Sequence, residues 1–178
     1  MARRIVLLRG INLGSRNRIA MPELRDVLTE AGFDDVRTYL LSGNVVLSSR
    51  ASPAKVGKDV ERLIADRFGL SIDVVVRTRD ELATVVERDP LGDVVTNPKR
   101  YQVTFLAAEL DAEVWRKLED AAVAPERLVA AGRELYAWHP DGIGPSRLWS
   151  RLAGRGLGVT ATARNWTTVT SLLELADE

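Results

Sequence analysis

The chain has 178 residues, of which 46% are hydrophobic and 28% charged, with a formal net charge of zero and no cysteine. This composition is typical of a globular protein of one or two domains and excludes wholesale disorder. The absence of cysteine excludes a disulfide framework, thiolate catalysis and cysteine metal sites. No stretch approaches the roughly 18 apolar residues of a membrane span, so we expect a soluble, cytoplasmic protein.

The first half of the sequence predicts the order β-α-β-β-α-β. Apolar runs predict the strands, and apolar residues at helical spacing, with Pro or Ser-Pro at the start and Gly at the end, predict the helices. The predicted elements are a strand over residues 4–8, a helix from Pro22 to Ala31, strands over Val36–Leu41 and Val45–Ser49 joined by Ser42-Gly43-Asn44, a helix from Ser52 to Gly69, and a strand over Ile72–Val76. Thr78 and Glu81 then predict a capping box that opens a short connecting helix.

The same order recurs after residues 90–99, a segment rich in Pro, Asn and Gly that we interpret as a linker. The elements predicted there are strands over Tyr101–Leu106, Arg127–Ala131, Leu135–Trp138 and Val159–Ala163, a helix capped by Asp111, a helix begun by Pro145, and a terminal helix capped by Asn165. We therefore predict an α+β fold with antiparallel sheets, made of two ferredoxin-like βαββαβ subdomains at residues 1–92 and 99–178.

Arginines are placed unevenly along this neutral chain. Residues 1–22 contain five arginines and no acid, and residues 142–173 contain four more and again no acid. Such stretches predict a positive face, although an arginine-rich composition, with only four lysines, is an equally good explanation.

The topology predicts two groups of loops that could bind a ligand. In a βαββαβ unit, the loop after the first strand and the turn between the second and third strands share one edge of the sheet, as do the loop before the second helix and the end of the fourth strand. The residues placed together in this way are Arg9, Gly10, Asn12, Gly14, Arg16, Ser42, Gly43 and Asn44 in the first group, and Gly142, Gly144, Ser146, Arg147, Arg164, Asn165 and Trp166 in the second.

Both groups combine glycine, amide side chains and arginine, a combination that favours anions. Glycine lets backbone N–H groups approach a ligand closely, helix N-termini offer unpaired donors, and guanidinium groups bind phosphate or carboxylate. Taken singly, these residues have simpler explanations: Gly43 serves a hairpin, Asn165 caps a helix, and Asn12 and Asn44 satisfy loop backbone.

Other motifs indicate less. His139 precedes Pro140-Asp141-Gly142, which favours a solvated turn residue, and no nucleophile motif or metal-ligand spacing surrounds it. The four tryptophans all lie in the second half, where core packing explains them better than base stacking. No carboxylate pair is placed by spacing for acid–base catalysis.

The sequence also resembles a known family. Segments that carry the resemblance are Leu7–Gly14, Met21–Arg25, Tyr39 with Ser42–Val46, Asp141–Gly144, and Thr162–Trp166. They are similar to the domain of unknown function 1697 family, which implies a bacterial protein of paired ferredoxin-like subdomains without an assigned activity. Leu41 stands where that family generally has Gln, and Arg147 where it commonly has Lys.

The leading functional hypothesis is a binding module for a small phosphorylated or carboxylated ligand. The alternatives are nucleic-acid binding through a basic face and an enzyme of unrecognised type. The sequence indicates no cofactor, no metal site and no membrane partner.

Overall fold

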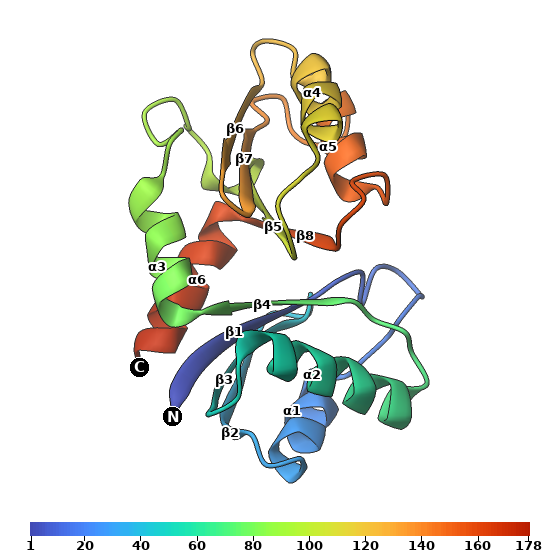
Figure 1. Cartoon of the computed structure of the whole chain (residues 1–178). Coiled ribbons are helices and arrows are strands. Elements are labelled where there is room, and N and C mark those ends of the chain that lie inside the picture. Colours follow the sequence, from blue (N-terminus) through green and yellow to red (C-terminus); the bar gives the residue numbers. More distant parts are fainter. The chain divides into compact units, whose positions relative to one another are not determined.

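The computed structural model describes all 178 residues and contains the order β-α-β-β-α-β twice (Figure 1). The first repeat consists of β1 (Ala2–Leu8), α1 (Met21–Glu30), β2 (Asp34–Tyr39), β3 (Asn44–Ser49), α2 (Pro53–Phe68) and β4 (Val74–Thr78). The second consists of β5 (Tyr101–Leu106), α4 (Ala112–Ala121), β6 (Arg127–Ala131), β7 (Glu134–Trp138), α5 (Arg147–Ala153) and β8 (Ala161–Asn165). Outside the repeats lie α3 (Arg79–Arg88), the 3-10 turn η1 (Pro98–Arg100) and α6 (Trp166–Asp177). The predicted α+β class with two βαββαβ units is confirmed.

The first sheet has the strand order β2-β3-β1-β4, and its neighbouring strands run antiparallel. In the central strand β1, Val6 pairs with Val45 of β3 and with Val76 of β4. Val6 and Leu8 belong to the core beneath α1 and α2, whereas Ile5 and Leu7 point to the opposite face and are also fully buried. Burial on both faces explains why this strand reads as a continuous apolar run.

Helices α1 and α2 cover one face of the first sheet (Figure 1). Their ends follow the signals in the sequence. The Ser52 hydroxyl accepts a hydrogen bond from the N–H of Lys55 at the start of α2, and Gly69 ends this helix in the left-handed conformation. A left-handed residue at this position costs least when it is glycine.

The second sheet repeats the arrangement, with strand order β6-β7-β5-β8 and antiparallel neighbours. Helices α4 and α5 cover one face, where Leu118, Leu148 and Leu152 pack against Leu135 and Ala137 of β7. As predicted, an Asp111 carboxylate oxygen accepts the N–H of Glu113 and caps α4.

Several strand boundaries differ from the prediction. β2 ends at Tyr39 because Leu40 adopts a left-handed conformation with φ 56°, which places Leu40 and Leu41 in the turn instead of the strand. β4 begins at Val74 and β8 at Ala161, each two residues later than predicted. Apolar residues just before a strand are indistinguishable from strand residues in the sequence pattern.

Contacts divide the chain into a first unit, Met1–Thr84 with Leu172–Glu178, and a second unit, Val85–Ser171. The expected division at residues 1–92 and 99–178 differs in two places, since the boundary falls within α3 and the last turns of α6 belong to the first unit. Ion pairs of Asp177 with Arg79 and of Glu178 with Arg37 hold this C-terminal segment in the first unit. The capping box at the start of α3 is reciprocal: the N–H of Thr78 donates to Glu81, and the N–H of Glu81 donates to Thr78.

None of the helices is both long enough and apolar enough to cross a membrane.

Candidate functional site

Residues 10–18 form a loop that is anchored in the core of the first unit at two points. Ile11 and Ile19 are buried, and all six residues between Asn12 and Ile19 are exposed. Asn12 closes the base of the loop: its N–H donates to Asn17, its side-chain oxygen accepts the N–H of Ile19, and its side-chain amide donates to the carbonyl of Ile19. The exposed segment is therefore held at a fixed base.

The β2–β3 turn lies against this loop, as the topology predicted. The N–H of Leu8 donates to the carbonyl of Gly43 at 2.9 Å, and the side-chain amide of Asn12 donates to the carbonyl of Leu41 at 2.6 Å. A Cβ on Gly43 would lie 2.7 Å from the Leu8 Cβ and 2.9 Å from the Ile11 Cδ1. Gly43, at φ 83°, is thus required both by its conformation and by close packing.

Several predicted ligand-binding residues of this first group have structural partners instead. The side chain of Asn44 is fully buried and donates to the carbonyl of Tyr39 and the hydroxyl of Ser42. Asn17, which was not among the predicted residues, also donates to the backbone, at the carbonyl of Gly10. These amide side chains therefore stabilise the loops through hydrogen bonds within the chain, so a ligand would have to be bound by other groups.

The groups that remain for a ligand gather at the exposed tip. The N–H of Arg16 donates to the carbonyl of Leu13 and closes a turn whose two central residues are Gly14 and Ser15. The backbone N–H groups of Gly14 and Ser15 make no hydrogen bond within the chain. The Arg18 guanidinium donates to the carbonyl of Gly14 at 3.3 Å and so lies beside the same turn. Neither Arg16 nor Arg18 forms an ion pair. Arg9 is half-buried at the base, where its N–H donates to the carbonyl of Asp73.

The residues of the second predicted group lie in two segments of the second unit, the loop after β7 and the end of β8. β7 and β8 flank β5, and Tyr101 and Gln102 at the start of β5 pair with Trp138 and Asn165, so the loop after β7 and the end of β8 share one edge. Gly142, at φ 86°, closes a turn by donating to the carbonyl of His139, and Gly144 and Arg147 are exposed.

Asn165 and Trp166 have structural roles at this edge. The side-chain oxygen of Asn165 accepts the N–H of Thr168 and caps α6. The Trp166 ring stacks on Tyr101 with 4.8 Å between ring centroids. Both contacts match the simpler explanations that the sequence offered for these residue types.

Arg164 is buried and does not face solvent. Ala161 faces the core under α4 and α5, so strand alternation places Thr162 and Arg164 on the opposite face of the sheet. The guanidinium donates to the Thr162 hydroxyl at 2.7 Å and to the carbonyl of Ala163. Burial lowers the pKa of Arg164 to about 10, so the group is still charged at neutral pH.

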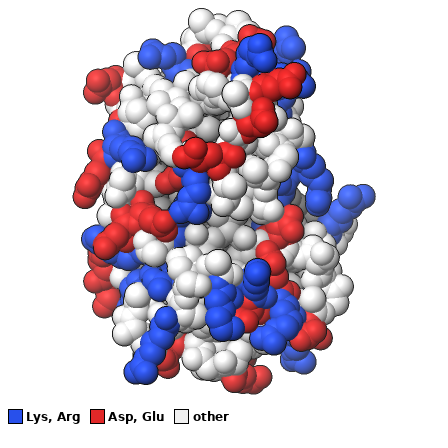
Figure 2. Space-filling view, viewed as in Figure 1, with Lys and Arg blue, Asp and Glu red and all other residues white.

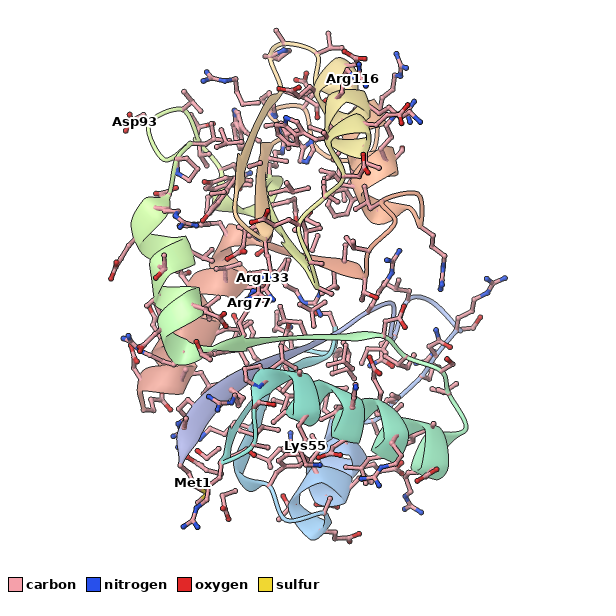
Figure 3. The ribbon with its side chains drawn as sticks, viewed as in Figure 1. Met1, Lys55, Arg77, Asp93, Arg116 and Arg133 are labelled. Atoms are coloured by element: carbon pink, nitrogen blue, oxygen red, sulfur yellow. The ribbon has the colours of Figure 1, made fainter.

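The first sheet contains an equivalent buried arginine that sequence reasoning missed. Arg77 of β4, labelled in Figure 3, is 1% exposed and donates to the carbonyl of Val76. Val76 faces α2, so Arg77 points to the face opposite the helices, as Arg164 does in β8. The fourth strand of each repeat thus carries one buried arginine on the face opposite the helices. The sequence feature that could have indicated Arg77 is a single cation directly after the apolar run of the last strand of the repeat.

The structure contradicts the expectation that His139 is a solvated turn residue, since its side chain is 0% exposed. Its Nδ1 forms a short contact with the Glu126 carboxylate, and its ring lies edge-on to Trp149 at 5.9 Å. The Ser146 hydroxyl donates to the same carboxylate at 2.6 Å and accepts the N–H of Trp149, which caps α5. Glu126, thirteen residues before His139 in the sequence, carried no local signal.

Ser146, His139 and Glu126 do not form a catalytic triad. In a triad the acid and the nucleophile bind opposite ring nitrogens of the histidine. Here both lie beside Nδ1, with the Ser146 hydroxyl at 3.3 Å from it, while Nε2 is buried without a partner. The Ser146 hydroxyl is committed to Glu126 and to the helix cap, so this cluster joins the α4–β6 loop to the β7–α5 loop and does not activate a nucleophile. It also adds an acid to the second group, which disfavours an anion there.

No three His, Asp or Glu side chains converge in a way that could hold a metal ion. The tip of the first loop is therefore the candidate site that the geometry leaves in place.

Comparisons with known proteins agree with this fold. The conserved bacterial protein SP0830 from Streptococcus pneumoniae superposes with a TM-score of 0.81, and the alignment covers 98% of each chain at 22% sequence identity. Identity this low shows a common fold alone. No curated protein matches the sequence. The profile of the family described as Protein of unknown function (DUF1697) matches residues 1–136, which is well over half of the sequence. The chain therefore belongs to the DUF1697 family.

Proposed function

We propose that the first unit binds a small anionic ligand, phosphorylated or carboxylated, at the tip of the Gly10–Arg18 loop. The observation that carries this proposal is the position of Arg16 and Arg18 on a glycine-containing turn, without a carboxylate partner. Of the other exposed cations in this unit, Lys55, Arg62 and Arg79 are paired with acids. Lys58 and Arg67 are unpaired but lie within α2 and not on a glycine-containing turn.

The tip supplies three kinds of contact that bind an anion. Gly14 and Ser15 present backbone N–H groups to solvent, and two guanidinium groups stand next to them. The buried anchors Ile11 and Ile19 fix the turn before a ligand arrives, which lowers the entropy that binding must overcome.

Small ligands fit this tip better than a nucleic acid does. The face shown in Figure 2 carries basic and acidic side chains interspersed, with no broad surface of one sign. A duplex or long single strand needs such a surface to neutralise successive phosphates. The tip is a local site with two free cations.

A thermal-shift screen of inorganic phosphate, citrate, nucleotides and phosphosugars tests the proposal. A ligand at 100 times its Kd stabilises the folded state by about 2.7 kcal/mol, which for a chain of this length raises Tm by roughly 5–10 °C. The double variant Arg16→Gln/Arg18→Gln is expected to lose the shift. Arg50→Gln, an exposed arginine of the same unit outside the loop, is the matched control and is expected to keep it.

Two outcomes contradict the proposal. One is the absence of a shift with every anion in the screen. The other is a shift that the double variant retains in full, because the ligand then binds somewhere else. An affinity that falls with added salt is expected, since exposed cations are screened.

A further inference from the structure

Three exposed leucines lie in the loop that carries the proposed anion site and in the turn that is bonded to its base. Leu13 is 68% exposed in the loop, and Leu40 and Leu41 are 60% and 69% exposed in the β2–β3 turn. The bond from Asn12 to the carbonyl of Leu41 joins the two turns, so the leucines belong to one edge of the first unit. We call these three residues the leucine tip.

Leu40 is held in a conformation that disfavours it. Its φ of 56° is left-handed, a region where a side chain with a Cβ is strained and where glycine or asparagine is the usual residue. Packing does not compensate for this strain, because the side chain is mostly in water. Strained residues with exposed apolar side chains are frequent where a surface recognises a partner.

The leucine tip is rigid at its base, and its side chains are exposed at two turns. Gly43 packs against Leu8 and Ile11 so closely that no Cβ fits, and Asn12 joins both turns with its side chain. The leucines are each at least 60% exposed. Apolar side chains that are exposed at turns suit a soft surface that they can enter better than a peptide that needs a groove.

The charges around the leucine tip favour a partner with a negatively charged surface. Residues 1–22 contain no acid, and Arg16 and Arg18 follow Leu13 in the same loop without ion pairs. A second copy of this chain would bring the same cations face to face, which like charges oppose. The tip has no aromatic side chain to stack on a base, so a single-stranded nucleic acid is also disfavoured.

We propose that the leucine tip docks on the surface of an anionic lipid bilayer, with the leucines in the interfacial layer and Arg16 and Arg18 on lipid phosphates. This inference rests on the proposed function, because the same two arginines bind the anion. It differs from the sequence expectation of no membrane partner, which followed from the absence of an apolar run long enough to span a bilayer and did not consider docking on the surface. Apolar insertion and attraction to anionic lipids reinforce each other in peripheral proteins.

Co-sedimentation with vesicles tests the inference on the full chain. We expect binding to vesicles that contain phosphatidylglycerol, at least tenfold weaker binding to pure phosphatidylcholine, and release by salt. The variant Leu13→Ser/Leu40→Asn/Leu41→Ser is expected to bind phosphatidylglycerol vesicles at least tenfold more weakly while its binding of inorganic phosphate is unchanged. Asparagine at position 40 tolerates the left-handed conformation, so the variant keeps the turn. Val123→Ser, an exposed apolar residue of the second unit, is the matched control.

The absence of cysteine allows a probe at one site. An environment-sensitive dye on the Ser15→Cys variant is expected to brighten on phosphatidylglycerol vesicles. The same dye on Ala31→Cys is expected to stay unchanged, because Ala31 lies at the C-terminal end of α1, a helix about 15 Å long whose N-terminal end follows the loop.

The outcomes separate this inference from the proposed function. Phosphate binding without vesicle binding overturns the lipid proposal and leaves the anion site in place. If the wild-type chain binds neither phosphate nor vesicles, the lipid proposal and the proposed anion site are both overturned. Equal binding to both kinds of vesicle, or binding of an acidic peptide or an oligonucleotide in place of vesicles, also overturns it. Vesicle binding that only the arginine double variant and the leucine triple variant lose supports it.

Discussion

The side-chain amide of Asn12 donates a 2.6 Å hydrogen bond to the carbonyl oxygen of Leu41, 29 residues away in the sequence. This bond joins the loop after β1 to the β2–β3 turn. Asn12 itself is left-handed, with φ 53°, and it makes two further side-chain bonds to the backbone of Ile19. One residue therefore fixes the base of the candidate site.

Replacing Asn12 is expected to destabilise the first unit in two separable ways. Asn12→Gly keeps the left-handed conformation and loses the three side-chain bonds, which is expected to cost about 1–3 kcal/mol. Asn12→Ala is expected to cost about 1 kcal/mol more, because alanine is strained at this φ. Urea unfolding measures both. Asn17→Gly is the control: its φ of 49° is similar, and its exposed side chain makes a single bond. A loss for Asn12→Gly no larger than that for Asn17→Gly would contradict the role of Asn12.

Gly43 is expected to tolerate substitution less well than Gly14. Both are left-handed, with φ of 83° and 63°, so alanine at either position costs roughly 1–2 kcal/mol in backbone strain. At Gly14 a Cβ meets nothing within 4 Å, whereas at Gly43 it would lie 2.7 Å from the Leu8 Cβ. Overpacking adds about 1–3 kcal/mol to Gly43→Ala. Thermal unfolding of the two variants measures the difference, and equal losses of stability would show that the turn moves away from β1.

Periodicity and turn signals in the sequence were sufficient to predict the fold. The capping box of Thr78 and Glu81 and the caps at Ser52 and Asp111 are local patterns, and each is present in the structure. The meeting of the loop after β1 with the β2–β3 turn followed from topology alone. Such features depend on neighbours in sequence or on strand order, which the pattern of apolar residues reveals.

Features that depend on distant side chains could not be predicted in this way. His139 sits in a sequence typical of a solvated turn, yet it is buried because Glu126 and Trp149 come to it from other elements. Arg164 was grouped with exposed loops, although strand alternation in β8 turns it inward. Leu40 resembled a strand residue, and only its left-handed backbone shows that the turn begins there. Burial of a polar group is a property of the packed unit and has no local signature.

Ser146 is expected to contribute more to stability than another N-cap serine of the same chain. Ser52→Ala removes one cap and is expected to cost about 1 kcal/mol. Ser146→Ala removes the cap of α5 and also the hydrogen bond that the Ser146 hydroxyl donates to Glu126. The free energy of unfolding is therefore expected to fall by about 2–3 kcal/mol. Urea unfolding compares the two variants. In the background of Glu126→Ala, the excess cost of Ser146→Ala over Ser52→Ala should disappear, and an excess that persists would rule out the bond to Glu126 as its source.

Tyr136 is expected to make the protein less stable at alkaline pH. Its buried hydroxyl donates to the carbonyl of Val85 at 3.0 Å, and burial, aided by the charge of Glu134, raises its pKa to about 12. In the unfolded chain the phenol has a pKa of about 10. Between these values the folded state keeps a proton that the unfolded state has lost, so stability falls as pH rises from about 10 to about 12.

The variant Tyr136→Phe tests this dependence. Urea unfolding across the alkaline range is expected to show a smaller loss of stability than in the wild-type chain, and ultraviolet absorbance is expected to lose a phenol that ionises near pH 12. Tyr39→Phe removes one phenol from the other unit and serves as the control. If Tyr136→Phe and the wild-type chain lost stability in parallel from about pH 10 upwards, the Tyr136 hydroxyl would not be the group that holds the proton in the folded state.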